Sequence, residues 1–401
     1  MLRNGEFARV EGVIRDRPLD SSALIMAAQG ILGVVRGNPG LAEAQLRRVF
    51  DSRADSALRR LAYYGLQTIL TEQERYAALE TVETRAQAEG ISTDTSSLIS
   101  AQAMRAVGPS RLEFRGVPAV AAAMKPSPLA GCPMVRCRVN GRGSEELWLD
   151  TGASLCVISE DLVSRLGIRV LSLPGAKAGT ATERKVRFRF GVLDSLECGG
   201  LVVRNLPVAL MKQSDLNLGI PFLRIPGIIG WPVLARLRTT LDYQNRLATL
   251  EPPARRGLSH FSASENRDCP RIFFFGGVPL VQVAIDSAGP LNFIFDTGAQ
   301  MSMITQSGVD KLLAAPDIVS SPGCIGGAGG GDAKNLRMVF GATLTIADQD
   351  VRPLVMPIHK LPTQDFPIGV DGLVGENVFH CFRVELDPTN GVVRLENREG
   401  E

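Results

Sequence analysis

The sequence lacks a long apolar run, a marked net charge and a basic leader segment. No stretch approaches the roughly 18–20 uninterrupted apolar residues of a membrane-spanning helix, so we expect no integral membrane segment. The formal net charge of +2 gives no reason to expect nucleic acid or an anionic membrane as a partner. The apolar stretch 23–35 is short and follows several acidic residues, unlike a secretory signal. We therefore expect a cytoplasmic location by default, or a periplasmic or secreted one if an export signal is missing from this chain.

Signatures of metal binding and of a disulfide framework are absent too. The seven cysteines are scattered, odd in number and without a CxxC pair, and the three histidines are not clustered. We expect structural thiols rather than disulfides, and no metal site. Cys156 and Cys381 lie in apolar strings, where buried free thiols are expected. His380 follows an apolar segment and is expected to be a structural residue.

Residues 1–125 are predicted to form a helical domain. Two segments align at an offset of 34 residues, 42–50 with 76–84 for example, and each holds two amphipathic stretches at helical spacing. Thr71, with Glu74 three residues later, predicts a capping-box start for the last helix of the pair, and Gly90 its end. A further helix is expected at 96–107. The 34-residue period resembles tetratricopeptide repeats, and an ordinary helical bundle is the alternative.

From Pro133 onward the chain changes to short apolar runs rich in Val, Ile, Leu and Phe, punctuated by Gly and Pro, which predicts a mostly β structure. Within it the tripeptide Asp-Thr-Gly occurs twice, at 150–152 and 296–298, each time after a hydrophobic run. A single Asp-Thr-Gly is weak evidence, because a turn or a helix cap explains it equally well.

Matching neighbours turn the two tripeptides into copies of one unit. Pro133 precedes Asp150 by 17 residues (150 − 133), and Pro279 precedes Asp296 by the same 17 (296 − 279). A hydrophobic-hydrophobic-Gly element follows each aspartate after 80 (230 − 150) and 79 residues (375 − 296), and a Leu-Asp pair follows each element after 12 (242 − 230; 387 − 375). Such self-similarity indicates an internal duplication. We expect lobes at 130–251 and 269–401, joined by a polar linker at 252–268. Short helical stretches are expected at 160–166 and 307–313.

Two such units could bring Asp150 and Asp296 face to face. Two carboxyl groups within hydrogen-bond distance cannot both ionise cheaply, so they share one proton near neutral or mildly acid pH. The charged member can take a proton from a water molecule while the protonated member polarises a substrate carbonyl. This chemistry needs no metal, no cofactor and no acyl-enzyme.

The strand-Asp-Thr-Gly-Ala units and the later hydrophobic-Gly elements resemble those of aspartic peptidases, over about 132–397. Because Ala153 and Ala299 follow the glycines, the chain is more similar to the retropepsin-like branch than to pepsins. The resemblance implies that each lobe supplies one catalytic aspartate, that the threonines brace the active-site loops, and that the hydrophobic-Gly elements pass beneath them. The resemblance also implies which residues support the active site: Thr151, Gly152, Ala153, Ser154, Gly230, Thr297, Gly298, Ala299, Gln300 and Gly375.

The family also implies a flap, a hairpin that closes over the substrate. The glycine run 323–331 lies about 30 residues after Asp296 (326 − 296), and the segment 175–180 lies at a matching distance from Asp150 (179 − 150 = 29). No Gly-Lys-Ser/Thr follows the run, which argues against a phosphate loop. An ordinary flexible loop remains the alternative for the first segment. The expected flap and substrate-binding residues are Gly179, Thr180, Gly326, Gly327, Gly329 and Gly330.

The sequence therefore predicts a multidomain protein: an all-α helical-repeat domain, then an all-β, two-lobed, acid-protease-like fold with pseudo-twofold lobes. The predicted function is that of an aspartic endopeptidase, acting as a monomer on a polypeptide substrate. The helical domain is a possible binding site for a protein partner. A non-catalytic peptide-binding scaffold is the alternative. A further alternative is a dimer in which Asp150 of one chain pairs with Asp150 of another. The linker is nevertheless long enough for Asp150 and Asp296 to pair within one chain.

Overall fold

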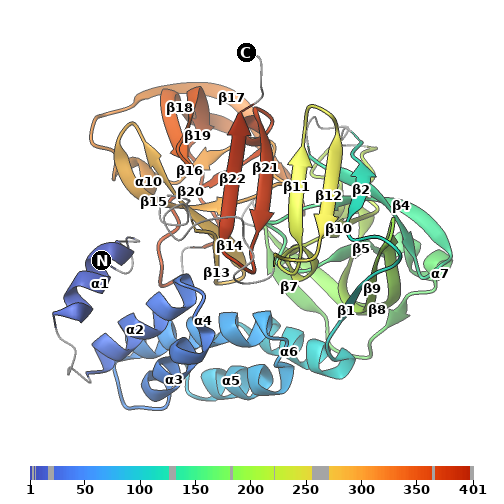
Figure 1. Cartoon of the computed structure of the whole chain (residues 1–401), viewed down its shortest axis with the longest axis horizontal. Helices are drawn as coiled ribbons and strands as arrows, with labels where there is room; N and C mark the ends of the chain where they lie inside the picture. The colour runs from blue at the N-terminus through green and yellow to red at the C-terminus, as the bar shows by residue number, and fades with distance from the viewer. Residues whose placement is uncertain are drawn as a thin grey trace.

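The molecule consists of an N-terminal helical region followed by a larger β-rich region (Figure 1). The computed structural model describes residues 1, 4, 6–16, 22–125, 132–180, 184–220, 222–254, 271–363 and 366–397. The predicted order, helices first and strands second, is confirmed. Most of the predicted linker, together with His260 and Cys269, lies outside the described residues.

The helical region stacks successive helices against one another. They are α1 (Phe7–Arg15), α2 (Ala23–Val35), α3 (Pro39–Phe50), α4 (Ser56–Glu72), α5 (Tyr76–Ala88) and α6 (Thr95–Val107). Side-chain caps start several of them: Asn38 accepts a hydrogen bond from the N–H of Leu41, and Asp94 accepts one from that of Ser96. The helix expected at 96–107 is confirmed. α6, the last helix of this region, ends at Val107, and two strands lie between it and residue 125, the predicted end of the helical domain.

The predicted capping box at Thr71 is wrong. Thr71 lies in the last turn of α4, which runs to Glu72, and α5 begins at Tyr76 without a side-chain cap. Ile69 and Leu70 are buried, so apolar packing extends α4 past the polar residues that suggested a new start. Gly90 ends α5 as expected, with a φ of +68°.

The first half of the β-rich region, residues 132–251, is built on a nine-stranded sheet that β1 joins from the preceding segment. Its strands are β1 (Arg111–Phe114), β3 (Met134–Val139), β4 (Gly143–Leu149), β5 (Val157–Ser159), β6 (Arg169–Val170), β7 (Ala176–Gly179), β8 (Lys185–Cys198), β9 (Leu201–Met211) and β10 (Gly227–Ile229). The helical stretch expected at 160–166 is present as η2 (Glu160–Leu162) and α7 (Val163–Leu166), and Gly167 ends it with a φ of +61°. Two short helices, α8 (Gln213–Leu216) and α9 (Trp231–Leu234), follow β9 and β10.

The second half, residues 271–397, holds an eight-stranded sheet. Its strands are β13 (Phe273–Phe275), β14 (Val278–Ile285), β15 (Ala288–Phe295), β16 (Met303–Ile304), β17 (Asp317–Gly327), β18 (Gly330–Ile346), β19 (Gln349–Pro357) and β20 (Gly372–Val374). Where a helical stretch was expected at 307–313, a single turn, α10 (Gln306–Val309), is present; another, α11 (Glu376–Phe379), follows β20.

A third sheet joins the two halves. It contains β2 (Val120–Ala123), β12 (Leu247–Glu251), β11 (Arg238–Asp242), β21 (Phe382–Asp387) and β22 (Val392–Asn397), in that spatial order. β11 of the first half pairs antiparallel with β21 of the second, and the two lie side by side in Figure 1. Backbone hydrogen bonds across this pair hold the two halves in a fixed relation.

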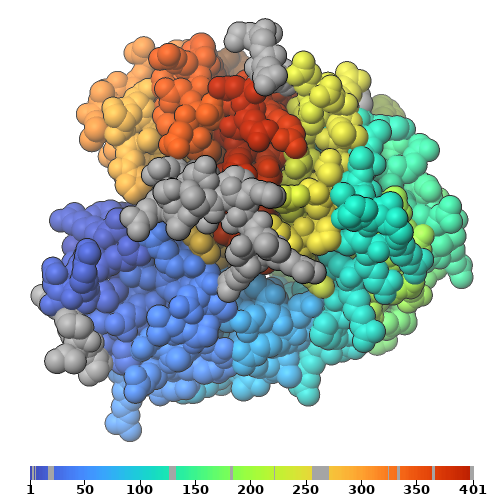
Figure 2. All heavy atoms as spheres, in the orientation of Figure 1, coloured from blue at the N-terminus to red at the C-terminus, as the bar shows by residue number. Residues whose placement is uncertain are grey.

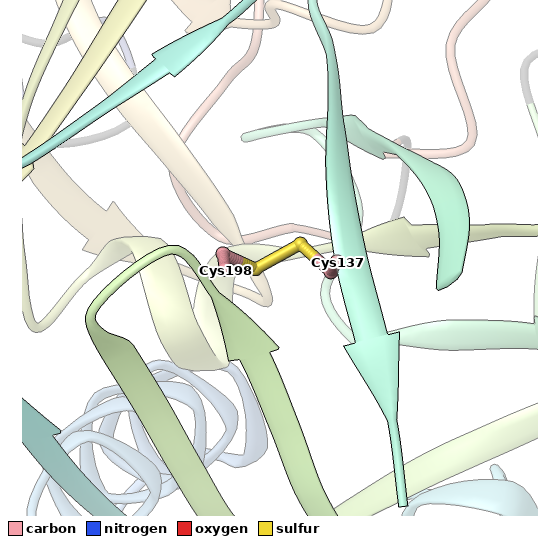
Figure 3. Close-up of a disulfide and its surroundings, with 2 residues drawn as sticks. All are labelled: Cys137 and Cys198. Atoms are coloured by element: carbon pink, nitrogen blue, oxygen red, sulfur yellow. A yellow bond between two sulfur atoms is a disulfide. The ribbon is translucent and has the colours of Figure 1, made fainter. Parts of the chain in front are cut away.

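The expectation that the cysteines are free thiols is wrong for one pair. Cys137 of β3 and Cys198 of β8 form a disulfide, and both are 1% exposed (Figure 3). Because Arg138 faces Glu197 in the β3–β8 register, the two cysteines stand opposite each other. Cys156 is a buried free thiol as predicted, whereas Cys381 is only half-buried.

The helical region packs directly against β13 of the second half. The ring of Phe7 in α1 meets that of Phe273 at 5.5 Å between centroids, and the ring of Tyr64 in α4 meets that of Phe275 at 6.5 Å. Phe275 is fully buried in a hydrophobic cluster that runs from the helices into the sheet. Figure 2 shows the blue helices pressed against the β-rich body along one side. The helices are therefore a fixed part of the molecule.

Candidate active site

Two buried strands deliver the two aspartates. Asp150 follows β4, which pairs in parallel with β10, and Asp296 follows β15, which pairs in parallel with β20. The backbone N–H of Asp150 donates to the carbonyl of Ile229 at 3.0 Å, and that of Asp296 donates to the carbonyl of Val374 at 3.0 Å. Each aspartate is thus fixed by the strand that carries the hydrophobic-Gly element of its own half.

The threonines after the aspartates lock the two loops together. The N–H of Thr151 donates to Thr297 Oγ1 at 3.1 Å, and the N–H of Thr297 donates to Thr151 Oγ1 at 3.0 Å. Each hydroxyl in turn donates to a carbonyl of the other half, Thr151 to Phe295 and Thr297 to Leu149. Both threonines are almost fully buried, so these hydrogen bonds are not exposed to competing water.

The carboxyl groups of Asp150 and Asp296 hydrogen-bond to each other. Backbone N–H groups also bond each carboxyl group: that of Ala153 donates to Asp150 Oδ1 at 3.1 Å, and that of Gly298 to Asp296 Oδ1 at 2.9 Å. A Cβ atom at Gly152 would lie 2.6 Å from Asp296 Cγ, and one at Gly298 would lie 2.4 Å from Asp150 Cγ. Glycine is therefore required at both positions for the carboxyl groups to meet.

The surroundings push the titrations of the two carboxyl groups apart. Burial raises the pKa of Asp150 well above its usual range, and the charge of Asp296 and the hydrogen bond between them raise it further. Burial also raises the pKa of Asp296, but the hydrogen bonds from the Gly298 N–H and from Asp150 oppose the increase. Both shifts favour a proton kept on the pair, which titrates as a unit.

Gly230 and Gly375, the glycines of the two hydrophobic-Gly elements, contact the loops that carry the aspartates. The N–H of the residue after each donates to a loop carbonyl, Trp231 to Ala153 and Glu376 to Ala299, both at 2.8 Å. A Cβ atom at Gly230 would lie 2.6 Å from the Ala153 carbonyl oxygen, and one at Gly375 would lie 2.8 Å from that of Ala299. Gly230 and Gly375 therefore lie directly beneath the loops, and there is no room for a side chain at either position.

The glycine-rich segments lie on two hairpins that touch. One is formed by β7 and β8, and the other by β17 and β18, where Gly327 pairs with Gly330. Arg184 Nη1 donates to the carbonyl of Gly329 at 2.9 Å, and Thr180 Oγ1 donates to the carbonyl of Arg184 at 3.0 Å. Gly329 N–H also reaches the carbonyl of Asp215 at 2.7 Å. The second hairpin thus bridges to the first half.

Two other predicted glycines lie at close contacts. A Cβ atom at Gly326 would lie 2.7 Å from the carbonyl oxygen of Leu218, and one at Gly179 would lie 3.2 Å from Pro362 Cβ. Of the residues just after the glycine turns, Ser154 lines the cavity described next. The side chain of Gln300 is exposed, and its carbonyl accepts a hydrogen bond from the Asn377 N–H at 3.1 Å.

A cavity of about 450 Å³ reaches Asp296. From the β-rich region it is lined by Gly152 and Ser154, by 177–180 of the first hairpin, and by 276–278. Its opposite wall comes from the helical region, through α4, α5 and the start of α6. No sequence pattern indicates this wall, because the contact joins segments far apart in the chain.

Further residues beside the aspartates escaped prediction. Cys132 Sγ donates to the carbonyl of Gly298 at 3.3 Å, and burial together with the charges of Asp150 and Asp296 raises the pKa of this thiol. Tyr243 has a buried hydroxyl without a hydrogen-bond partner among the described residues, and burial raises its pKa. No sequence pattern marks either residue.

Within the described ranges, no three His, Cys, Asp or Glu side chains gather in a way that could hold a metal ion. In the same part of the chain, no helix has the length and apolar character needed to span a bilayer.

Residues 135–231 match the family model described as aspartyl protease. The match includes Asp150 and Gly230 and ends before Asp296, so this similarity lies within the first half of the β-rich region. The solved structure of the aspartic proteinase from Irpex lacteus is 12% identical, with a TM-score of 0.45, and the similarity covers 70% of this chain and 98% of that one. A search of curated proteins found no match.

Proposed function

We propose that this chain is an aspartic endopeptidase that hydrolyses peptide bonds in a site built from both halves of one molecule. The observation that carries the proposal is the hydrogen-bonded pair of carboxyl groups at Asp150 and Asp296, held by crossed threonines beside a cavity. Asp296, as the ionised member, takes a proton from a water molecule. Asp150, as the protonated member, donates to the scissile carbonyl oxygen as the water attacks its carbon.

We further propose that the two halves are duplicated lobes. Three pairs of equivalent hydrogen bonds support this: aspartate N–H to strand carbonyl, N–H of the residue after the glycine to loop carbonyl, and glycine N–H to a side chain six residues after the aspartate. In the last pair the acceptors are Cys156 Sγ and Ser302 Oγ, at 3.3 and 3.0 Å (156 − 150 = 6; 302 − 296 = 6). In this scheme the two touching hairpins are flaps of a retropepsin-like site, and the molecule acts as a monomer.

The helical region is proposed to orient a polypeptide substrate at the site. Its paired helices resemble tetratricopeptide repeats in period. A non-catalytic peptide-binding scaffold is the rival function, and the intact carboxyl pair argues against it, because two half-buried carboxyl groups in contact are costly to keep without chemistry for them to do.

Replacement of either aspartate by asparagine tests the proposal. Asp150→Asn and Asp296→Asn, made separately, are expected to abolish cleavage of an unfolded protein that the wild type cleaves at mildly acid pH. Circular dichroism should show that each variant is folded. Full activity in either variant rules out the pair, and an inactive wild type across the pH range supports the scaffold.

A further inference from the structure

The helical wall of the cavity carries polar side chains among apolar ones. Along α4, Tyr64, Gln67, Thr68 and Thr71 follow one another at helical spacing, and all line the cavity, as does Glu83 of α5. Neither the aspartates nor the hairpins need this polar surface. It is therefore available for contact with a ligand that enters the cavity.

Glu83 contributes a buried carboxyl group to this wall. It is 1% exposed; Tyr63 Oη donates to its Oε2 at 2.8 Å, and Gln67 Nε2 donates to its Oε1 at 2.9 Å. A carboxylate offers about four acceptor positions, so two donors leave part of its capacity unused. Burial raises the pKa of Glu83 to about 7, and the charge of Asp94 contributes to the increase.

Thr68 supplies an independent sign of a missing ligand. Its side chain is 2% exposed and lines the same cavity, yet its hydroxyl has no hydrogen-bond partner among the described residues. A buried hydroxyl without a partner is unfavourable, and native proteins keep few of them. A polar group of a bound molecule would complete its hydrogen bonding.

We propose that Glu83 and Thr68 form a substrate pocket for a basic side chain, lysine or arginine, of the polypeptide whose backbone reaches the aspartate pair. The pocket rests on the proposed peptidase function and names its substrate class. A cationic donor can bond to the unused acceptor positions of Glu83 and to the Thr68 hydroxyl, and its charge favours the ionised form of Glu83, whereas an apolar side chain leaves the Thr68 hydroxyl unpaired. Asp94 adds negative charge to the lining, and Lys177 on the first hairpin is an exposed cation at its edge.

The pocket is a permanent part of the molecule. α4 and α2 pack on β13 through a shared hydrophobic core, so the wall that carries Glu83 does not leave the cavity as a detachable segment would. A basic residue at a fixed distance from the scissile bond is the expected recognition element.

Pairs of peptides test the pocket. The two peptides of a pair differ at one position, which holds lysine in one peptide and the uncharged norleucine in the other. Each position around the cleaved bond is tested in turn. For wild type we expect kcat/KM to favour lysine by about tenfold or more at one position, the scale of a charge-assisted hydrogen bond. Glu83→Gln should reduce this preference to less than about twofold. Glu80→Gln is the matched control, since Glu80 lies on the same helix but pairs with Arg105.

A second variant separates recognition from folding. Thr68→Val keeps the shape of the side chain and removes the unpaired hydroxyl, so the thermal midpoint should not fall, while KM for the lysine peptide should rise about threefold or more. A preference that survives Glu83→Gln, or its absence from an active wild type, overturns the pocket.

If the wild type cleaves no peptide, the peptidase proposal fails but the pocket can still be tested. Fluorescence anisotropy then measures binding of the lysine and norleucine peptides to wild type and to the Glu83→Gln variant. Tighter binding of the lysine peptide by wild type alone supports the pocket, and equal binding of both peptides overturns it.

Discussion

The carboxyl groups of Asp150 and Asp296 can touch only because Gly152 and Gly298 carry no Cβ atom. The arrangement has a cost in stability. Above the ordinary carboxyl pKa of 3.8, the unfolded chain has released a proton that the folded molecule still holds on the aspartate pair, because burial raises the pKa of both carboxyl groups. Because the folded state binds more protons in that range, stability falls as the pH rises through it.

Asp150→Asn is therefore expected to stabilise the fold while it destroys activity. At pH 7 the free energy of unfolding should increase by roughly 1–3 kcal/mol, and the gain should vanish below about pH 4, where both carboxyl groups are protonated in either state. Thermal unfolding from pH 3.5 to 8 measures it, with Asp194→Asn, an exposed residue of β8, as the control. A gain that does not depend on pH would contradict the buried pair.

Among individual residues, the sequence indicates well that the two aspartates pair, and it indicates poorly which cysteines are bonded. Asp150 and Asp296 each follow a buried strand and sit in matching contexts, so their pairing could be anticipated. The Cys137–Cys198 disulfide depends on which residues of β3 and β8 stand opposite each other. That register is set by the packing of the sheet, and no local pattern encodes it.

The two hairpins are the elements whose conformation bears most directly on access to the site. Gly330, at the turn of β17–β18, has a φ of +117°, a conformation that other residues adopt only with strain. The neighbouring Gly329 makes the contacts to Arg184 and Asp215. The turn therefore sets how the second hairpin meets the first half.

Gly330→Ala should strain this turn and lower kcat/KM about five- to tenfold, from a cost of about 1 kcal/mol or more. Gly341→Ala is the control, because Gly341 lies on the same strand with a φ of +72° and open space around it. It should cost similar stability and leave kcat/KM unchanged. Equal kinetic effects of both changes would show that the turn has no special role.

The disulfide joins two cysteines of the first sheet, Cys137 and Cys198, that are 61 positions apart in the chain. Removing it with Cys137→Ala and Cys198→Ala together should lower the free energy of unfolding by about 2–4 kcal/mol, since the reduced unfolded chain gains loop entropy. Denaturant titration measures the change, and thiol counting before and after reduction verifies the bond in the wild type. Two extra reactive thiols in the unreduced, unfolded wild type would contradict the bond.

Helical elements were predicted where local signals dominate and missed where packing overrides them. The helix at 96–107 and the stop at Gly90 follow from spacing and from a left-handed glycine. The predicted helix start at Thr71 was wrong because α4 continues to Glu72, and the burial of its apolar face stabilises this continuation. Polar cap residues compete weakly against several buried side chains.

Over the whole molecule, one hydrophobic core runs from the helices into the second half of the β-rich region. The sequence places the helical part and the β part in order, yet nothing in it predicts that the helices line the cavity beside Asp296. The contact between Tyr64 and Phe275, for example, joins residues 211 positions apart (275 − 64), and only the folded arrangement specifies it.

A shared core predicts shared unfolding. Phe275→Ala should cost about 3–5 kcal/mol, because this ring is fully buried where β13 meets α4. Calorimetry should show the helical and β-rich parts unfolding at a lower temperature in one transition. Phe222→Ala is the control, since Phe222 is 99% exposed. A separate early transition for the helices would contradict the shared core.

The central claim, that one chain builds one complete site from Asp150 and Asp296, is tested most directly by mixing two inactive variants. Cleavage rates of Asp150→Asn, of Asp296→Asn and of their equimolar mixture are measured beside wild type at the same total concentration. The single-chain site predicts background rates in all three samples and cleavage by wild type alone. Activity in either variant, or its recovery on mixing, would contradict a site made within one chain.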